Sequence, residues 1–300
     1  MSFPDSRSDP TILYNCPVMR LVYTFLLVGV TAIWGWTFVV VADAVALYGV
    51  LAFLTLRFAL ASMALSPAAS RMTRHTLLVG GGIGVVYAAG YLFQTFGLLY
   101  TTPTNSGLIT GLFVVFAPLT ARALFGVRFS RPVLFAICLS LLGMLLLAGQ
   151  SPEGVRFGDA LTMICAAALG AHIALLSRYA AEHDASALTL AQTLSMTALF
   201  AVMWPVFEPI EFPPVEVWFA IILTGLVASA AAFYIQTTVQ QKIPAARTAI
   251  ILTMEPVFAA FFGFWLAGDR LVAIQIAGAI LIVSALLVGE VLPTMFRRKK

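Results

Sequence analysis

Charged side chains are scarce in this chain. Only 10% of its 300 residues are Asp, Glu, Lys or Arg, whereas 61% are hydrophobic, and the mean hydropathy is +0.99. A soluble domain usually carries about 25% charged residues. This imbalance excludes an ordinary soluble fold and predicts that much of the surface faces lipid. Because no polar linker divides the chain, we expect a single membrane domain.

Cysteine is rare, and common catalytic and nucleotide-binding motifs are missing. Cys16, Cys138 and Cys165 stand apart, without a CxxC pair or metal-ligand spacing. The GxSxG, HExxH and Walker patterns are absent, and no Lys-Ser/Thr follows the glycine-rich run at 80–84. We therefore expect neither an enzyme nor a bound metal or cofactor. The glycines at 80–84 are expected to allow close helix packing.

The apolar residues form ten runs that are each long enough to cross a bilayer. About 20 helical residues span ~30 Å of hydrocarbon, and these runs are continuous rather than alternating, which excludes barrel strands. The sequence thus predicts an all-α integral membrane protein of ten transmembrane helices. The expected spans are 21–42, 47–66, 77–100, 103–124, 132–149, 157–180, 187–206, 215–238, 244–266 and 271–292.

The basic residues lie almost entirely on one side of these spans. With the N-terminus in the cytoplasm, fourteen of the 17 Lys and Arg residues fall on the cytoplasmic side, and only Arg156 and Arg270 fall opposite. Positively charged loops are retained in the cytoplasm. We therefore expect cytoplasmic tails at 1–20 and 293–300, the second one basic.

Several sequence features recur at a separation of 135–142 residues. The segment 91–95 (YLFQT) resembles 233–237 (FYIQT), Pro103 corresponds to Pro244, and Gly35 corresponds to Gly170. The repeats would be 21–149 and 157–292, with five spans each. Since five is odd, the second copy enters the membrane from the other side. Such inverted repeats are typical of secondary transporters, in which they enclose a site near the bilayer midplane.

Four short motifs resemble one transporter family. They are 34–38 (WGWTF), 94–105, 255–259 (EPVFA) and 268–271 (GDRL), and the resemblance covers residues 21–292. Together they are similar to the EamA-type exporters of the drug/metabolite transporter superfamily, and among these to bacterial exporters of aromatic amino acids. Asp269 stands where that family commonly has Glu. The resemblance implies ten helices around a central cavity and the export of amino acids or related metabolites.

Glu255, Arg57 and His172 lie deep inside predicted spans, where charge is costly and usually faces a cavity or a partner. Glu255 either binds substrate or protons, or it is held by Arg57 or His172, or it caps the helix interrupted at Pro256. Arg57 either binds a substrate carboxylate or ties helices together. His172 either relays protons or joins two helices through a hydrogen bond.

Aromatic and amide side chains complete the candidate site. Trp34 and Trp36 lie at mid-membrane, and their two-residue spacing on a helix prevents both from facing one cavity squarely. Gln94 and Gln236 are related by the repeat, and buried amides seek partners. The predicted substrate-binding residues are Trp34, Trp36, Tyr91, Gln94, His172, Tyr234, Gln236 and Glu255.

The sequence thus predicts a secondary transporter that exports amino acids, aromatic ones and other neutral ones, by alternating access. Its expected location is the bacterial inner membrane, with the bilayer and the small-molecule substrate as partners and no nucleic acid. Export of drugs, nucleosides or other small metabolites is the alternative. A monomer is one arrangement that the sequence leaves open.

Overall fold

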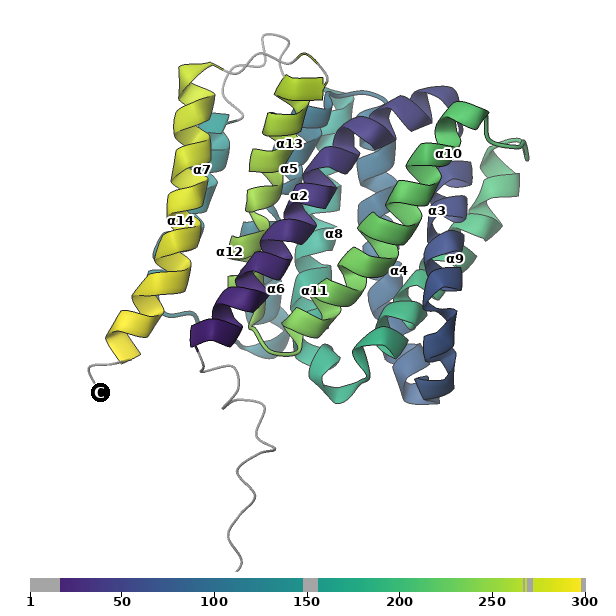
Figure 1. Cartoon of the computed structure of the whole chain (residues 1–300). Coiled ribbons are helices and arrows are strands. Elements are labelled where there is room, and N and C mark those ends of the chain that lie inside the picture. Colours follow the sequence, from purple (N-terminus) through teal and green to yellow (C-terminus); the bar gives the residue numbers. More distant parts are fainter. Residues whose placement is uncertain (1–16, 148–155, 267, 269–271, 298–300) are drawn as a thin grey trace, which may run out of the picture.

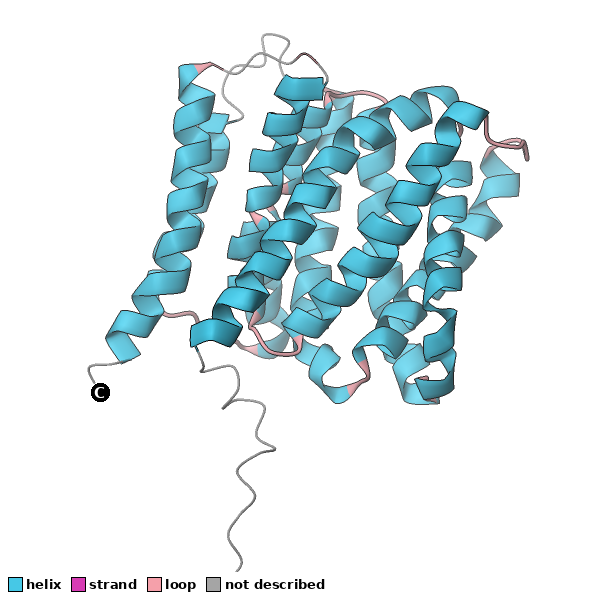
Figure 2. Ribbon diagram, in the orientation of Figure 1, coloured by secondary structure: helices cyan, strands magenta, loops and turns pink. Residues whose placement is uncertain are grey.

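The structure, a computed structural model, describes residues 17–147, 156–266, 268 and 272–297. Within them every regular element is helical (Figure 2). The elements are α2 (Pro17–Leu47), α3 (Val50–Leu65), η1 (Ser66–Arg71), α4 (Arg74–Leu98), α5 (Pro103–Thr110), α6 (Phe113–Phe125), α7 (Arg131–Leu147), α8 (Phe157–Tyr179), η2 (Ala180–Glu182), α9 (Ala185–Phe207), α10 (Val215–Ile222), η3 (Leu223–Ala231), α11 (Ala232–Gln240), α12 (Ala245–Leu252), α13 (Met254–Leu266) and α14 (Ala273–Arg297).

Eight helical stretches in the described part of the chain are long and apolar enough to cross a membrane. They are Leu21–Leu47, Val50–Arg71, Arg74–Leu98, Pro103–Phe125, Phe157–Glu182, Ala185–Phe207, Val215–Gln240 and Ala245–Leu266, and two shorter apolar stretches are Arg131–Leu146 and Ala273–Ala285. Large apolar side chains such as Phe25, Val202 and Trp265 are exposed, as a lipid-facing surface requires. The expected all-helical membrane class is confirmed for these residues, while the count of ten spans stays a prediction.

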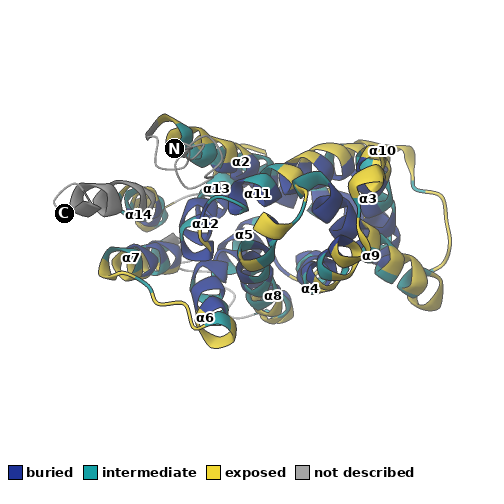
Figure 3. Ribbon diagram, turned by 90° about the horizontal axis from the view of Figure 1, so that it is seen from below, coloured by how far each residue is buried: buried dark blue, intermediate teal, exposed yellow. Residues whose placement is uncertain are grey.

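The helices pack in pairs that join the two halves of the chain (Figures 1 and 3). α2 lies along α13, and α8 lies along α6; α4 contacts both α8 and α9, and α7 pairs with α14. The start of α2 and the end of α14 are on the same side, the lower one in Figure 1. The connections from η1 to α4, α6 to α7, η2 to α9 and α11 to α12 lie there as well.

Glycines set the closeness of these pairs. A Cβ atom at Gly35 of α2 would lie 2.7 Å from the backbone nitrogen of Ala259 in α13. One at Gly170 of α8 would lie 2.7 Å from the backbone nitrogen of Ala117 in α6. In the glycine-rich run, Gly80 and Gly84 likewise adjoin α9, 2.6 Å from the Ala191 Cβ atom and 2.5 Å from the Gln192 carbonyl oxygen. The predicted role in helix packing is confirmed for Gly80 and Gly84, whereas a Cβ atom at Gly81 or Gly82 would meet nothing within 4 Å.

Two predicted spans are interrupted halfway instead of being continuous helices. α5 ends at Thr110 and α6 begins at Phe113. Between them, 3₁₀-type backbone hydrogen bonds join residues that are three apart, from Leu112 N to Ile109 O and from Val114 N to Gly111 O. α12 and α13 are separated by Thr253 alone. A third span contains the π-helical segment η3 between α10 and α11. Such irregular turns inside membrane helices often accompany functional sites.

One clamp joins the two halves at the upper side of Figure 1, where α9 ends and α3 begins. The carboxylate of Glu208, which follows α9, accepts hydrogen bonds of 3.0 Å from the backbone amides of Leu51 and Ala52. These are N-terminal amides of α3 that have no carbonyl partner within their own helix. Glu208 therefore caps a helix that belongs to the other half of the chain.

Candidate functional site

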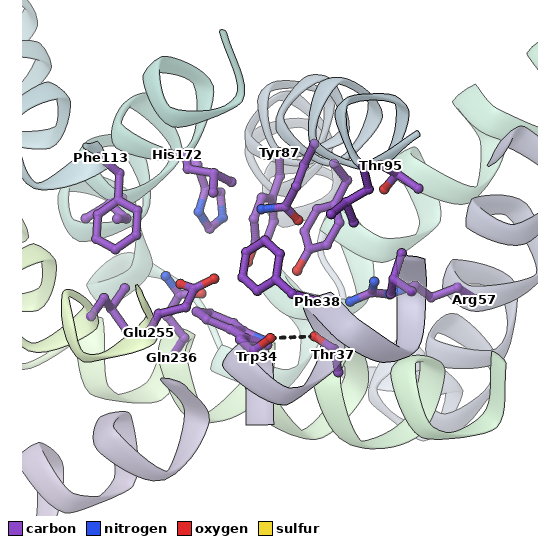
Figure 4. A pocket seen from close by; sticks show the side chains of 17 residues that line it. Trp34, Thr37, Phe38, Arg57, Tyr87, Thr95, Phe113, His172, Gln236 and Glu255 are labelled. Atoms are coloured by element: carbon purple, nitrogen blue, oxygen red, sulfur yellow. Dashed lines mark hydrogen bonds between the residues drawn. The ribbon is translucent and has the colours of Figure 1, made fainter. Parts of the chain in front are cut away.

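A small cavity lies between the helices near the middle of the membrane-crossing segments (Figure 4). Its space of about 30 Å³ holds only about two water molecules. Aromatic rings and a few polar groups form its wall. The lining residues are Trp34, Thr37, Phe38, Val41, Arg57, Tyr87, Tyr91, Gln94, Thr95, Leu98, Phe113, Leu169, His172, Ile173, Gln236, Leu252 and Glu255.

The cavity brings together six of the eight residues that the sequence nominated. These are Trp34, Tyr91, Gln94, His172, Gln236 and Glu255. Trp36 points elsewhere and packs its ring against Phe219 and Phe262, at centroid distances of 6.3 Å and 6.4 Å. Tyr234 is also outside the lining, and its side chain is exposed. That Trp36 and Tyr234 contact the substrate remains a prediction, and their positions outside the cavity lining do not favour it.

Tyr87 is a lining residue that the sequence reasoning missed. Its ring stacks on the His172 imidazole at 3.6 Å between centroids, and it lies 5.1 Å from the Tyr91 ring. Tyr87 precedes Tyr91 by one helical turn, and Tyr91 precedes Gln94 and Thr95 by another. Polar residues at this spacing lie on one face of an otherwise apolar helix, and this pattern predicts that Tyr87 faces the cavity together with Tyr91 and Gln94.

Glu255 lies in the first turn of α13, directly after the interruption at Thr253. Its side chain is buried, and within the described residues its carboxyl group has neither a hydrogen bond nor an ion pair. Pro256 follows it, so the Leu252 carbonyl cannot receive the usual helical amide from that position. The two sequence hypotheses in which Arg57 or His172 holds Glu255 are wrong, because both of those side chains bind other partners.

Arg57 is a buried cation that is held by an aromatic ring and a hydroxyl group. Its Nε donates to Ser229 Oγ at 2.9 Å, and its guanidinium carbon lies 4.7 Å from the centroid of the Tyr91 ring. The ring face is attractive to a cation. Arg57 thus joins α3 to the π-helical segment, which is the helix-joining role considered from the sequence, and it also lines the cavity. Binding of a substrate carboxylate by Arg57 stays a prediction.

His172 joins two helices. Its Nε2 lies 2.9 Å from the side-chain oxygen of Gln192 on α9, and the Gln192 amide nitrogen donates to the Leu188 carbonyl oxygen at 3.4 Å. Because that nitrogen is the donor, the Gln192 oxygen is left to accept, and His172 Nε2 supplies the proton. The helix-joining hydrogen bond predicted for His172 is therefore present.

The two related glutamines have different surroundings. Gln94 donates from Nε2 to Thr110 Oγ1 at 3.1 Å, next to the interruption between α5 and α6. Gln236 donates from Nε2 to Gln240 Oε1 at 2.9 Å, and Gln240 was not singled out from the sequence. The oxygen of Gln236 is buried without a hydrogen-bond partner in the described structure. The two amides therefore line the same cavity with unequal chemistry.

Long apolar helices around a buried cavity lined by aromatic and polar groups define a multi-span membrane protein with an internal cavity. The sequence profile of the EamA-like transporter family matches the chain in two stretches, 21–149 and 156–288. The chain belongs to this family, which lies within the drug/metabolite transporter superfamily, and it is a membrane transporter.

Individual relatives agree with this membership. A protein of Archaeoglobus fulgidus, described as an uncharacterized transporter, is 32% identical over 272 residues, which cover 90% of this chain and 86% of that protein. A crystal structure described only as that of a protein superposes with a TM-score of 0.73 over 90% of this chain and 97% of the other, at 20% identity. The second similarity supports the fold.

Proposed function

We propose that the chain is a secondary transporter that exports amino acids, aromatic ones among them, across the bacterial inner membrane by alternating access. The observation that carries the proposal is the polarity of the cavity. The carboxyl group of Glu255 lies on one side and the guanidinium group of Arg57 on the other, with Trp34 and Phe38 between them (Figure 4). A zwitterion with an apolar side chain matches two opposite charges separated by aromatic walls.

Alternating access rests on a proposed inverted repeat of five spans in each half. The close approaches of Gly35 to Ala259 and of Gly170 to Ala117 are equivalent in this repeat. A Cβ atom on either glycine would lie 2.7 Å from the backbone nitrogen of the alanine. Equivalent positions also meet each other, as they do at a twofold axis. Ser62 Oγ lies 3.3 Å from Thr197 Oγ1, 135 residues apart.

The same relationship supports counting ten spans. A Cβ at Gly143 of α7 would lie 2.8 Å from the carbonyl oxygen of Gly278 in α14, again at a separation of 135 residues. α7 and α14 therefore form an equivalent pair at the axis, although their apolar stretches are the two shorter ones. The family profile also matches the chain twice. The proposed halves are 21–149 and 157–292.

The proposed orientation places the lower side of Figure 1 in the cytoplasm. The connections on that side carry most of the basic residues in the described chain, Arg71, Arg74, Arg122, Arg128, Arg131, Arg178, Lys242 and Arg247, whereas Arg156 lies at the start of α8 on the other side. Short basic loops are retained in the cytoplasm.

Counterflow in liposomes tests the proposal. Purified protein is reconstituted into vesicles loaded with unlabelled phenylalanine, and uptake of radiolabelled phenylalanine, leucine, a nucleoside and a cationic drug is followed. Labelled amino acids should accumulate, and protein-free vesicles should show none of this uptake. Exchange of the nucleoside or the drug with no amino-acid exchange, each tested against its own unlabelled form, would assign the other substrate class.

A further inference from the structure

The hydrogen-bond donors that line the cavity are largely used within the protein. Trp34 Nε1 donates to the Ala228 carbonyl at 2.8 Å, and Thr37 Oγ1 donates to the Trp34 carbonyl at 2.8 Å (Figure 4). The side-chain nitrogens of Gln94 and Gln236 also have acceptors, at 3.1 Å and 2.9 Å. On the Glu255 side of the cavity, ligand groups that could only accept hydrogen bonds would therefore find few donors, whereas the guanidinium group of Arg57 offers N–H groups on the other side.

The acceptors are in the opposite situation. The oxygen of Gln236 is buried with no donor, and the Glu255 carboxyl group has no hydrogen bond or ion pair in the part of the chain that the structure describes. Both side chains are more than nine-tenths buried. A buried acceptor left without a donor destabilises the folded protein, and more so when it is charged. A ligand that brings donors to this wall would recover that free energy.

The orientation of the Gln236 amide is fixed by its neighbours. Gln240 Nε2 lies 2.9 Å from the Ile173 carbonyl oxygen, which can only accept a hydrogen bond. Gln240 must therefore present its own oxygen to Gln236, and that oxygen takes the Gln236 amide nitrogen at 2.9 Å. The remaining Gln236 atom is its oxygen. Rotating the amide by 180° would place two oxygens against each other, so the atom of Gln236 without a partner is the acceptor oxygen.

His172 adds a third group of the same kind. Since its Nε2 donates to Gln192, a neutral imidazole has its Nδ1 as an acceptor. Glu255, Gln236 and His172 all line the cavity, and Figure 4 shows them on the side away from Arg57. Three acceptors from three helices thus gather where the donors are used up.

We propose that this acceptor wall binds the protonated amino group of the ligand, and that the amino group, not the carboxylate, is the required feature of the substrate. An ammonium group offers three donors and a positive charge, which match one carboxylate and two neutral acceptors. The aromatic rings of Trp34 and Phe113 provide faces for a cation and for an apolar side chain. Small primary amines without a carboxylate are therefore ligands as well. This inference deepens the proposed transport function and rests on it.

Arg57 explains why the carboxylate is dispensable. Its charge already faces the Tyr91 ring, and its Nε is bonded to Ser229. The guanidinium group is therefore partly satisfied in the absence of ligand, whereas Glu255 is not. Losing a ligand carboxylate should weaken binding less than losing the amino group.

Three compounds with the same ring and nearly the same chain separate these contributions. Binding of phenylalanine, phenethylamine and 3-phenylpropionate to purified protein is measured by titration calorimetry and by the shift in melting temperature. Phenylalanine and phenethylamine should bind, and phenylpropionate should bind at least tenfold more weakly than either. Equal or tighter binding of phenylpropionate than of phenethylamine would overturn the proposal.

Two variants test whether Glu255 and Gln236 bind the amino group of the ligand. Glu255→Gln and Gln236→Met should each weaken phenethylamine binding by tenfold or more, while melting temperatures identify any variant that fails to fold. The matched control is Glu216→Gln, which removes an exposed carboxylate in the first turn of α10. Unchanged amine affinity in a folded Glu255→Gln protein contradicts the inference. If amines bind as expected but no amino acid or amine is exchanged in liposomes, the transport proposal fails and the binding site stands.

Discussion

The indole nitrogen of Trp34 is hydrogen-bonded to the carbonyl oxygen of Ala228, at 2.8 Å and across 194 residues of sequence. Ala228 lies in the π-helical segment η3, whose next residue, Ser229, accepts from Arg57 Nε at 2.9 Å. Two long side chains from the first half of the chain therefore bind adjacent residues of one irregular turn in the second half. The cavity wall at Trp34 and the shape of η3 depend on the same bond.

Replacing Trp34 with Phe should reveal this dependence. The variant keeps an aromatic face but leaves the Ala228 carbonyl without its donor, at a cost of about 1–3 kcal/mol. We expect a lower melting temperature and weaker exchange of labelled phenylalanine. Trp36→Phe is the control, because the Trp36 ring only packs against Phe219 and Phe262. Equal effects of the two substitutions would show that the hydrogen bond is unimportant.

The paired glycines should respond alike to substitution. Gly35→Ala and Gly170→Ala each place a Cβ 2.7 Å from a backbone nitrogen, so each should destabilise the protein by about 1–3 kcal/mol. Gly29→Ala meets nothing within 4 Å and should be neutral or stabilising by about 0.5–1 kcal/mol. Melting temperatures in detergent give the comparison. A large loss at only one of the two paired sites would argue against equivalent packing.

Glu255 is also the place to test proton coupling. Glu255→Gln keeps the shape of the side chain but cannot titrate. Because the variant should also bind ligand more weakly, counterflow is compared at saturating phenylalanine; if transport is coupled to protons through Glu255, uptake driven by an imposed pH gradient should fall much more than counterflow under those conditions. Other titratable groups at the cavity, Tyr87, Tyr91 and His172, remain in place. Equal behaviour of variant and wild type in both assays would refute the coupling role.

The junction between α4 and α9 should weaken in acid. His183 lies 3.0 Å from Thr76 Oγ1 through its Nδ1, and burial, followed by the nearby charge of His75, lowers the pKa of His183. His183 therefore binds a proton more readily in the unfolded chain than in the folded protein. Its contribution to the free energy of unfolding is fully present well above pH ~6.5 and is lost as the pH falls below that value. Arg71, Glu182 and Asp184 lie in the same region.

Melting temperatures measured from pH 8 to pH 5.5 test this expectation. The wild type should lose more stability over this range than His183→Asn, which cannot gain the proton. If the two proteins follow the same pH profile, His183 is not responsible for the acid sensitivity.

The topology can be tested by labelling single cysteines in a background without Cys16, Cys138 and Cys165. An impermeant reagent added to intact cells should modify a cysteine at position 155 and should spare one at position 128, on the basic side. Permeabilised cells provide the control for reactivity at both positions. Ready labelling of position 128 in intact cells would reverse the proposed orientation.

Much of the helical framework could be predicted from the sequence, because continuous apolar runs and sparse charge leave few alternatives to membrane helices. The interruption at Gly111 could not, whereas Pro256 already indicated a break close to Thr253. Hydropathy does not detect a local change from α-helical hydrogen bonds to 3₁₀-type hydrogen bonds. Such turns arise from packing between distant helices, here between Gly111 and Met144 or Pro256.

The sequence pointed to cavity-lining residues where a polar residue stood out in an apolar run, as at Glu255 and His172. It was less informative where helix rotation mattered. Tyr234 follows the π-helical segment, and a wider turn shifts the angular position of every residue after it, so the facing direction cannot be extrapolated at 3.6 residues per turn. Gln240 was missed because its importance comes from contacts with Ile173 and Ser177 on α8.

The clamp at Glu208 adds to the resistance of its own face of the protein to opening. Any movement that separates the end of α9 from the start of α3 strips the Leu51 and Ala52 amides of their shared carboxylate. A lost cap of this kind costs about 1 kcal/mol. That cost corresponds to about a fivefold change in the ratio of two conformations. On the opposite face, α9 is capped by its own preceding residue, Asp184, through the Ala187 amide at 3.0 Å, and this cap travels with the helix. In the proposed alternating-access cycle, the Glu208 cap therefore favours conformations that are shut on its side, and the bonds of Arg71 to Ser186 and of Thr76 to His183 act in the same way on the opposite side.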